Sequence, residues 1–373
     1  MTTDTDIRSG HTASAPHLRA GRKRRARARG RRAAAKLTLC ALGLSVLLAT
    51  LAAVCIGAYP ITPAQAWTAL TASGAALAND AALQQAHTVL VDIRLPRVVL
   101  GLLVGVGFGA AGSALQALFR NPLADPGLIG ISSGAALGAA TLIVLGSALG
   151  AALPVALPVA AFAGALAVSA LVYRLAAARG RLALPLLLLG GIAINALVGA
   201  AIGLLTYIAN DAQLRSLTFW SLGSLGGAQL PLIVAVTPFV AIGIGLIARH
   251  SRALNALQLG EIEAQHLGVP VQRVKRTVLV AAALGVGALV SCTGAIGFIG
   301  LVAPHCVRLA CGPDQRIVLP GAMLLGATLT VLSDLAARTM AAPAEVPLGI
   351  LTALLGAPFF LVLLWRRRSQ AGL

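Results

Sequence analysis

Apolar residues dominate the chain from Leu37 onward, in long runs that are separated by shorter polar stretches. A helix needs about 20 consecutive apolar residues to cross the hydrocarbon core of a bilayer. The runs therefore predict an all-α membrane protein with about ten transmembrane helices, several of them broken by Gly or Pro. The predicted spans cover residues 37–59, 97–118, 128–149, 154–177, 184–208, 230–248, 277–294, 296–310, 318–337 and 347–365.

The composition agrees with this pattern and excludes an ordinary soluble domain. Apolar residues make up 58% of the 373 residues and charged residues only 11%, with a mean hydropathy of +0.89. Such values are typical of a multi-pass membrane protein. The five cysteines lack CxxC or zinc-type spacing, so we interpret them as packing residues and expect no metal site.

The formal net charge of +18 is distributed in a way that predicts the topology. If the N-terminus is cytoplasmic, 25 of the 29 Lys and Arg residues fall on the cytoplasmic side of the predicted spans. Membrane proteins concentrate basic residues on that side. Both termini are therefore predicted to be cytoplasmic, and only Arg94, Arg97, Arg215 and Arg338 lie outside.

The pattern divides the chain into three parts. Residues 1–36 carry many Arg residues among Ala, Gly and Ser, which predicts a disordered basic cytoplasmic arm. Its position before a span favours contact with membrane lipid over nucleic acid, so no nucleic-acid partner is expected. Residues 37–368 form the transmembrane domain, which includes a cytoplasmic loop at 251–276, and residues 369–373 form a short cytoplasmic tail.

A polar corner, FRNPLADPGLIGISSG at residues 119–134, separates two of the apolar runs. It contains Arg120, Asn121 and Asp125 together with two prolines. Unpaired backbone groups are costly in hydrocarbon, so irregular backbone beside a membrane must be buried in protein or line a cavity. The corner therefore indicates a transport path.

The loop at residues 251–276 is the longest predicted cytoplasmic connection between spans. Its apolar spacing predicts short amphipathic helices that are broken at Gly260 and Gly268. Glu261, Glu263 and Gln265 are then available to face a partner. From the residues alone, a docking surface and a solvated amphipathic loop remain equal interpretations.

The chain lacks the GxxxxGK[ST] loop that cradles nucleotide phosphates. Its only lysines are Lys23, Lys36 and Lys275, and none follows a Gly-rich turn from strand to helix. We expect no catalytic residues, and any ATP hydrolysis would require a separate subunit.

Several motifs, in this order, resemble the permease subunits of bacterial type II ABC importers, the FecCD-type family for iron-siderophores, haem and vitamin B12. They are RLPR (94–97), RNPLADPGLIGISSGAALG (120–138), GEIEAQHLGV (260–269), GAIGFIGLVAPHCVRL (294–309) and PAEVPLGILTALLGAPFF (343–360). The resemblance extends from about Leu37 to Arg368.

The resemblance implies an inner-membrane homodimer with its pathway at the two-fold interface. The other expected partners are two cytoplasmic ATP-binding subunits and a periplasmic substrate-binding protein. No cofactor is expected in this chain, because ATP and magnesium would be used by the partner subunit.

The resemblance also implies roles for individual residues. Asn121 and Leu123 match part of a cytoplasmic gate, and the connection around residues 181–185 is expected to supply the other part. The residues expected at the contact with the ATP-binding subunit are Leu257, Gly260, Glu261, Leu267 and Gly268.

On the outer side, Arg94, Arg97 and Arg338 correspond to arginines that dock acidic residues of the binding protein. Few basic residues lie on that side, so their presence there calls for a partner. Pairing of Arg94 and Arg97 with Asp92 or with interfacial lipid is the alternative.

Haem is the favoured cargo, because the sequence of residues 119–138 most resembles that of haem permeases and a mainly apolar passage suits a flat macrocycle. Ferric siderophore and cobalamin are the alternatives.

An ion-coupled secondary transporter, from another functional class, would need carboxylates inside the spans. The nearest acidic residues lie only at span boundaries: Asp92, Asp125, Asp211, Asp334 and Glu345.

Overall fold

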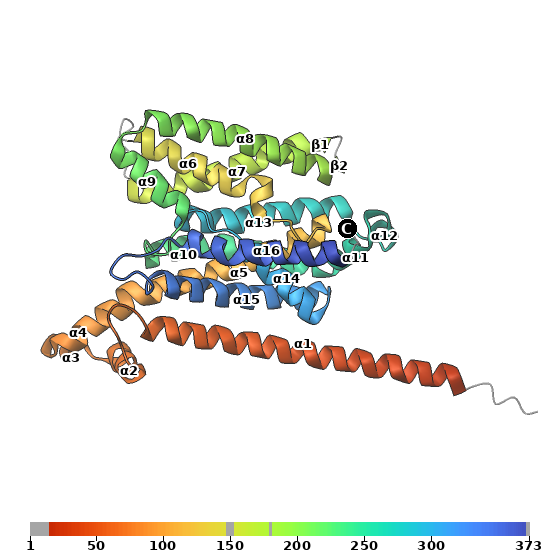
Figure 1. Cartoon of the computed structure of the whole chain (residues 1–373), viewed down its shortest axis with the longest axis horizontal. Coiled ribbons are helices and arrows are strands. Elements are labelled where there is room, and N and C mark those ends of the chain that lie inside the picture. Colours follow the sequence, from red (N-terminus) through yellow and green to blue (C-terminus); the bar gives the residue numbers. More distant parts are fainter. Residues whose placement is uncertain (1–14, 147–152, 179–180, 371–373) are drawn as a thin grey trace, which may run out of the picture.

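The computed structural model describes residues 15–146, 153–178 and 181–370, which form a bundle of helices (Figure 1). Within these residues, seven helical segments are long and apolar enough to cross a membrane. They lie in α1 (Ala15–Cys55), α5 (Leu95–Phe119), α7 (Leu153–Ala176), α8 (Leu184–Ile208), α10 (Leu230–Arg249), α13 (Val271–Thr293) and α15 (Gln315–Ala337). Shorter apolar helices are α6 (Ile131–Leu145), α14 (Ile299–Cys311) and the first part of α16 (Leu348–Gln370). Every predicted span contains one of these helices, which confirms an all-α membrane protein.

Short elements connect the long helices. On one side lie α2 (Pro63–Thr71), α3 (Gly74–Asn79), α4 (Ala81–Thr88), the π-helical turn η1 (Val89–Arg94) and α9 (Asp211–Leu222). At the opposite end lie the antiparallel pair β1 (Ala177–Ala178) and β2 (Arg181–Leu182), α11 (Ser251–Leu259) and α12 (Glu261–His266), whereas η2 (Pro126–Ile129) lies inside the bundle beside Gly191 of α8 (Figure 1).

Capping residues explain two of the connecting helices that the apolar pattern did not predict. Thr62 and Gln65 form a capping box at the start of α2, with the Gln65 N–H donating to Thr62 Oγ1 over 3.3 Å. Asn210 and Gln213 form a second capping box at the start of α9, over 2.9 Å. Each side chain satisfies a backbone donor that the first helical turn leaves unpaired.

The N-terminal arm differs from its prediction, because α1 is helical from Ala15 and extends past the end of the bundle (Figure 1). Ala and Arg are good helix formers, and an arm that continues an existing helix needs no new nucleus. The prediction of disorder is therefore corrected for residues 15–36. Residues 1–14 and 371–373 lie outside the described residues, whereas residues 369–370 belong to α16.

The core of the bundle surrounds α5, which is buried along most of its length. Glycines on α5 let neighbouring backbones approach closely, as small residues do between transmembrane helices. A Cβ atom at Gly109 would lie 2.2 Å from the carbonyl oxygen of Ala322 on α15. One at Gly112 would lie 1.8 Å from the carbonyl oxygen of Gly300 on α14. These contacts hold α14 and α15 against α5.

A Gly112→Ala substitution is expected to lower the free energy of unfolding by about 1–3 kcal/mol, the usual range for overpacking. The matched control is Gly245→Ala on α10, where a Cβ atom would meet no neighbour within 4 Å. That variant is expected to gain about 0.5–1 kcal/mol from helix propensity. Unfolding in mixed micelles by titration with SDS measures both, and equal effects of the two substitutions would contradict the close contact.

Candidate functional site

The corner after α5 is a defined turn that exposes both predicted gate residues. Arg120 ends α5 in the left-handed conformation, with φ of 50°. The Leu123 N–H donates to Asn121 Oδ1 over 2.9 Å, and the Gly127 N–H donates to Asp125 Oδ1 over 2.7 Å. Asn121 and Leu123 are exposed at the tip of this turn. Burial raises the pKa of the Asp125 carboxyl, while the hydrogen bond from Gly127 acts in the opposite direction.

Helix α8 holds this corner through a residue that the sequence reasoning missed. Asn195 accepts a hydrogen bond from Ser133 Oγ over 2.5 Å and donates Nδ2–H to the Gly127 carbonyl over 3.3 Å. Gly191, one turn earlier, lets α8 approach closely, because a Cβ atom there would lie 2.0 Å from the Leu128 carbonyl oxygen. In the sequence, the signal for such an interhelical hydrogen bond is a single Asn inside an apolar span.

The second predicted gate segment, residues 181–185, is bonded to the start of α13. The Leu182 N–H donates to Gln272 Oε1 over 2.8 Å. Lys275 Nζ donates to the Leu182 carbonyl over 3.1 Å. Lys275 is only 1% exposed, although it is a lysine. A movement of α13 therefore reaches β2 directly.

The loop at 251–276 contains the two short helices that its pattern predicts, α11 and α12. They are separated at Gly260, whose φ is 144°, and α12 is followed by Gly268 with φ of 78°. Both angles favour glycine. Glu261 Oε1 lies 2.5 Å from Lys275 Nζ, so one buried lysine joins α12 to the hairpin of β1 and β2.

The outward face of these helices differs in part from the predicted contact residues. Leu257 is buried against the bundle, and its contact with a partner stays a prediction. Leu259, Ile262 and Leu267 are instead 68%, 65% and 65% exposed. Leu257 and Leu259 are two positions apart and so point in different directions on a helix. Leu259 and Ile262 were missed, although large apolar residues in a polar loop are a signal for a contact surface.

Arg97, predicted to be free for docking, lies instead in a buried network at the opposite end of the bundle. Its Nε donates to Asp334 over 2.8 Å, and its Nη1 donates to Glu345 over 2.8 Å. The exposed fractions of the Arg97 and Asp334 side chains are 9% and 4%, whereas that of Glu345 is 46%. Asp92, the alternative partner considered for Arg97, is not its partner.

Arg94 and Arg338 cap the C-terminal end of α1. Arg94 Nη1 donates to the carbonyls of Val54 and Cys55 over 2.6 and 3.0 Å, and Arg338 Nη2 donates to the carbonyl of Ala53. The last carbonyls of a helix lack partners within the helix and attract cations. Burial lowers the pKa of Arg338. Both arginines are thus bonded within the chain, and their docking of a binding protein stays a prediction.

Comparisons with known proteins agree with this architecture. Residues 45–366 match the profile of the FecCD transport family. The chain is 47% identical over 304 residues to the hemin transport system permease protein HmuU of Yersinia pestis, covering 81% of this chain and 90% of HmuU. It is 41% identical over 305 residues to the cobalamin import system permease protein BtuC of Halobacterium salinarum, covering 82% of this chain and 81% of that relative.

A solved structure described as a metal-chelate type ABC transporter in an inward-facing conformation has the same fold. It superposes with a TM-score of 0.76 at 31% identity and covers 88% of this chain and 98% of that structure. The family match spans most of the chain, and the described residues include seven helical segments that could cross a membrane. The chain therefore belongs to the FecCD transport family and is the permease of an ABC importer in the inner membrane.

Proposed function

We propose that this chain is the permease subunit of an ATP-driven importer that moves haem from the periplasm to the cytoplasm. It crosses the membrane ten times with both termini in the cytoplasm. This topology gives every predicted span a helix and keeps the basic residues on one side.

The observation that carries the proposal is the connection from α12 to the predicted gate. Leu259 on α11, Ile262 on α12 and Leu267 just after α12 form an exposed apolar surface, suited to a cleft in an ATP-binding subunit. Behind that surface, Glu261 pairs with Lys275, which bonds to Leu182. Movement of the ATP-binding subunit would thus act on residues 181–185.

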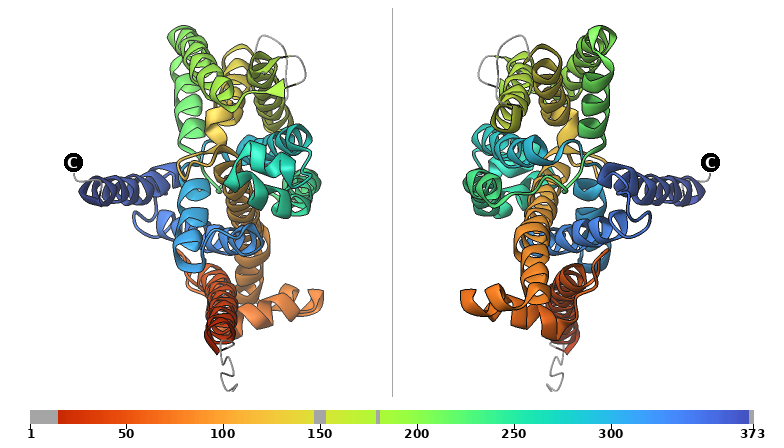
Figure 2. Two further views of the ribbon diagram at one scale, coloured as in Figure 1. Left: turned by 90° about the vertical axis from the view of Figure 1, so that its right-hand side faces the viewer. Right: turned by 90° about the vertical axis from the view of Figure 1, so that its left-hand side faces the viewer.

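The complete machine requires further subunits. The chain has no phosphate-binding loop, so ATP and magnesium bind to two copies of a separate ATP-binding subunit. A second copy of this chain completes the pathway, with Asn121 and Leu123 contributing to the cytoplasmic gate. Helix α16 projects from the side of the bundle, which favours packing against a second copy (Figure 2).

A periplasmic binding protein delivers the cargo to the outer surface. The three arginines predicted to dock it lie beneath that surface, where their bonds hold α1, α5 and α15 together. We infer that Arg94, Arg97 and Arg338 support the docking surface from below. Glu345, with its half-exposed carboxylate, is the member of the network that reaches the surface.

Haem is favoured as cargo by the 47% identity to a hemin permease, and cobalamin is the second candidate because other relatives import it. Proteoliposomes that contain the permease, its ATP-binding subunit and the cognate binding protein test the choice. We expect ATP-dependent accumulation of haem but not of cobalamin or a ferric siderophore. A complex with an ATP-binding subunit that cannot hydrolyse ATP is the control, and accumulation of cobalamin alone would overturn the assignment.

A further inference from the structure

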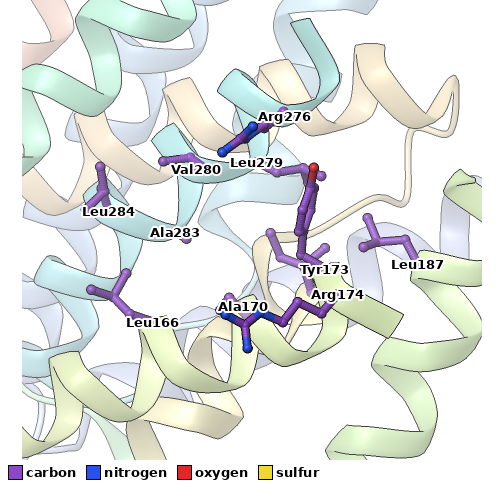
Figure 3. A pocket seen from close by; sticks show the side chains of 12 residues that line it. Leu166, Ala170, Tyr173, Arg174, Leu187, Arg276, Leu279, Val280, Ala283 and Leu284 are labelled. Carbon is purple, nitrogen blue, oxygen red and sulfur yellow. The ribbon is translucent and has the colours of Figure 1, made fainter. Parts of the chain in front are cut away.

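A cavity of about 380 Å³ lies between α7 and α13 (Figure 3). Apolar side chains from both helices form most of its wall, among them Leu166 and Ala170 from α7 and Val280 and Leu284 from α13. Ala170 and Val280 are exposed at the surface of the bundle, so the cavity opens to the surroundings of these helices.

The two charged residues of the cavity lie at one end. Arg174 lies in the last turn of α7 and Arg276 near the start of α13, on opposite sides of the open space (Figure 3). Leu166 and Leu284 each lie eight residues from the arginine on their own helix. At 1.5 Å per residue, the apolar wall extends about 12 Å from the arginines along the helices.

The arginines lack counter-ions of their own. Within residues 15–146, 153–178 and 181–370, neither Arg174 nor Arg276 forms an ion pair, and both side chains are exposed. Ser169 also lines the cavity, and its buried hydroxyl has no hydrogen-bond partner in the described part of the chain. The end of the cavity that holds the arginines therefore offers two positive charges to an anion.

We propose that this cavity binds one anionic phospholipid, with its phosphate between Arg174 and Arg276 and an acyl chain along the apolar wall. A basic end followed by a long apolar wall has the same order of polarity as a phospholipid in the membrane. Basic pockets between transmembrane helices at the cytoplasmic side are suited to anionic headgroups. A free phosphate would leave the wall uncovered, and a zwitterionic lipid would bring its own cationic group beside two arginines that are already positive.

This lipid would lie beside the residues that connect α12 to the hairpin. Arg276 follows Lys275, the lysine that bonds to Glu261 and Leu182. The wall of the cavity also includes Leu187 from α8 and Ile129 from η2. Leu187 follows the predicted gate segment at 181–185, and Ile129 follows the corner that contains Asn121 and Leu123. The bound lipid would therefore stabilise one spacing of α7 and α13.

Native mass spectrometry of the full-length permease, released from nanodiscs with equal amounts of phosphatidylglycerol and phosphatidylcholine, tests the proposal. We expect the protein to retain phosphatidylglycerol preferentially. Arg174→Gln or Arg276→Gln should each lower that retention about fivefold, and the double variant about 25-fold. Arg249→Gln on α10, another exposed arginine near a helix end, is the matched control and should change nothing.

Two further measurements identify the occupant. Ala170→Trp fills the cavity from an exposed position and should abolish retention of the lipid while both arginines remain. Excess inorganic phosphate should not displace the lipid. Equal retention of both lipids by the unaltered protein, unchanged retention by the double variant, displacement by phosphate, or displacement by haem would each overturn the proposal.

Discussion

A permease with both Ile262 and Leu267 replaced by aspartate is expected to lose the ATP-driven uptake of its cargo. The two side chains are 65% exposed on α12 and the turn that follows it, so they offer apolar anchors to an ATP-binding subunit. Removing one anchor from the centre of an interface costs about 2 kcal/mol or more. Two such losses weaken the association by roughly a thousandfold. The aspartates would also be desolvated without partners in the bound state.

Two measurements on this variant separate loss of coupling from loss of folding. Co-purification reports the amount of ATP-binding subunit retained, and proteoliposomes report uptake. Exposed positions rarely change stability by more than about 0.5 kcal/mol, so the variant should insert and fold as the unaltered chain does. The conservative pair Ile262→Leu and Leu267→Met keeps the apolar surface and should keep both activities. If the aspartate variant retained its subunit and its uptake, the contact would have to lie elsewhere.

An Arg97→Met variant is expected to lose about 3–5 kcal/mol of its free energy of unfolding, the cost of leaving a buried carboxylate unpaired. Asp334 is the carboxylate concerned, because its side chain is 4% exposed and Arg97 donates to both of its oxygens, over 2.8 and 3.0 Å. Arg338 lies 3.7 Å from Asp334 and is too far to replace those hydrogen bonds. Titration with SDS in mixed micelles measures the loss.

The double variant Arg97→Met with Asp334→Leu should recover most of the stability lost by Arg97→Met alone. Replacing both members of a buried pair by apolar side chains leaves no unpaired charge. Arg215→Met on α9 is the matched control, because Arg215 is an exposed arginine on the same side of the membrane in the predicted topology. A loss below about 1 kcal/mol for Arg97→Met would mean that water reaches Asp334 and that the network does not stabilise the fold.

The helices and their breaks could be predicted from the sequence, because their causes are local. Residues 184–208 were predicted as a span and form α8 over the same residues. Gly260 and Gly268 were predicted to break the cytoplasmic loop and lie where positive φ ends one short helix and follows the next. Desolvation of backbone groups makes a long apolar run helical in a membrane, whatever its neighbours. The same argument missed α2 and α9, whose capping boxes are readable but lie outside apolar runs.

The candidate site was predictable only where a residue's position follows from its own segment. Asn121 and Leu123 lie in a turn that its Asn and Pro residues form locally, and the structure places them at its exposed tip. The burial of Leu257 and the exposure of Leu259 could not be predicted, because the direction of a short helix relative to the bundle depends on what it packs against. Asn195 was missed because its partners, Ser133 and Gly127, are more than 60 residues away.

By itself, the sequence determined the all-α membrane class, the order of the spans and the family to which the chain belongs, since all three depend on local hydropathy and motif order. Only the tertiary structure decided what the charged residues do. Arg97 and Lys275 are both buried, because distant segments supply their partners, Asp334 for Arg97 and Glu261 with Leu182 for Lys275. A long charged side chain is stable in either environment, so its place depends on the groups that the folded bundle brings within hydrogen-bonding distance.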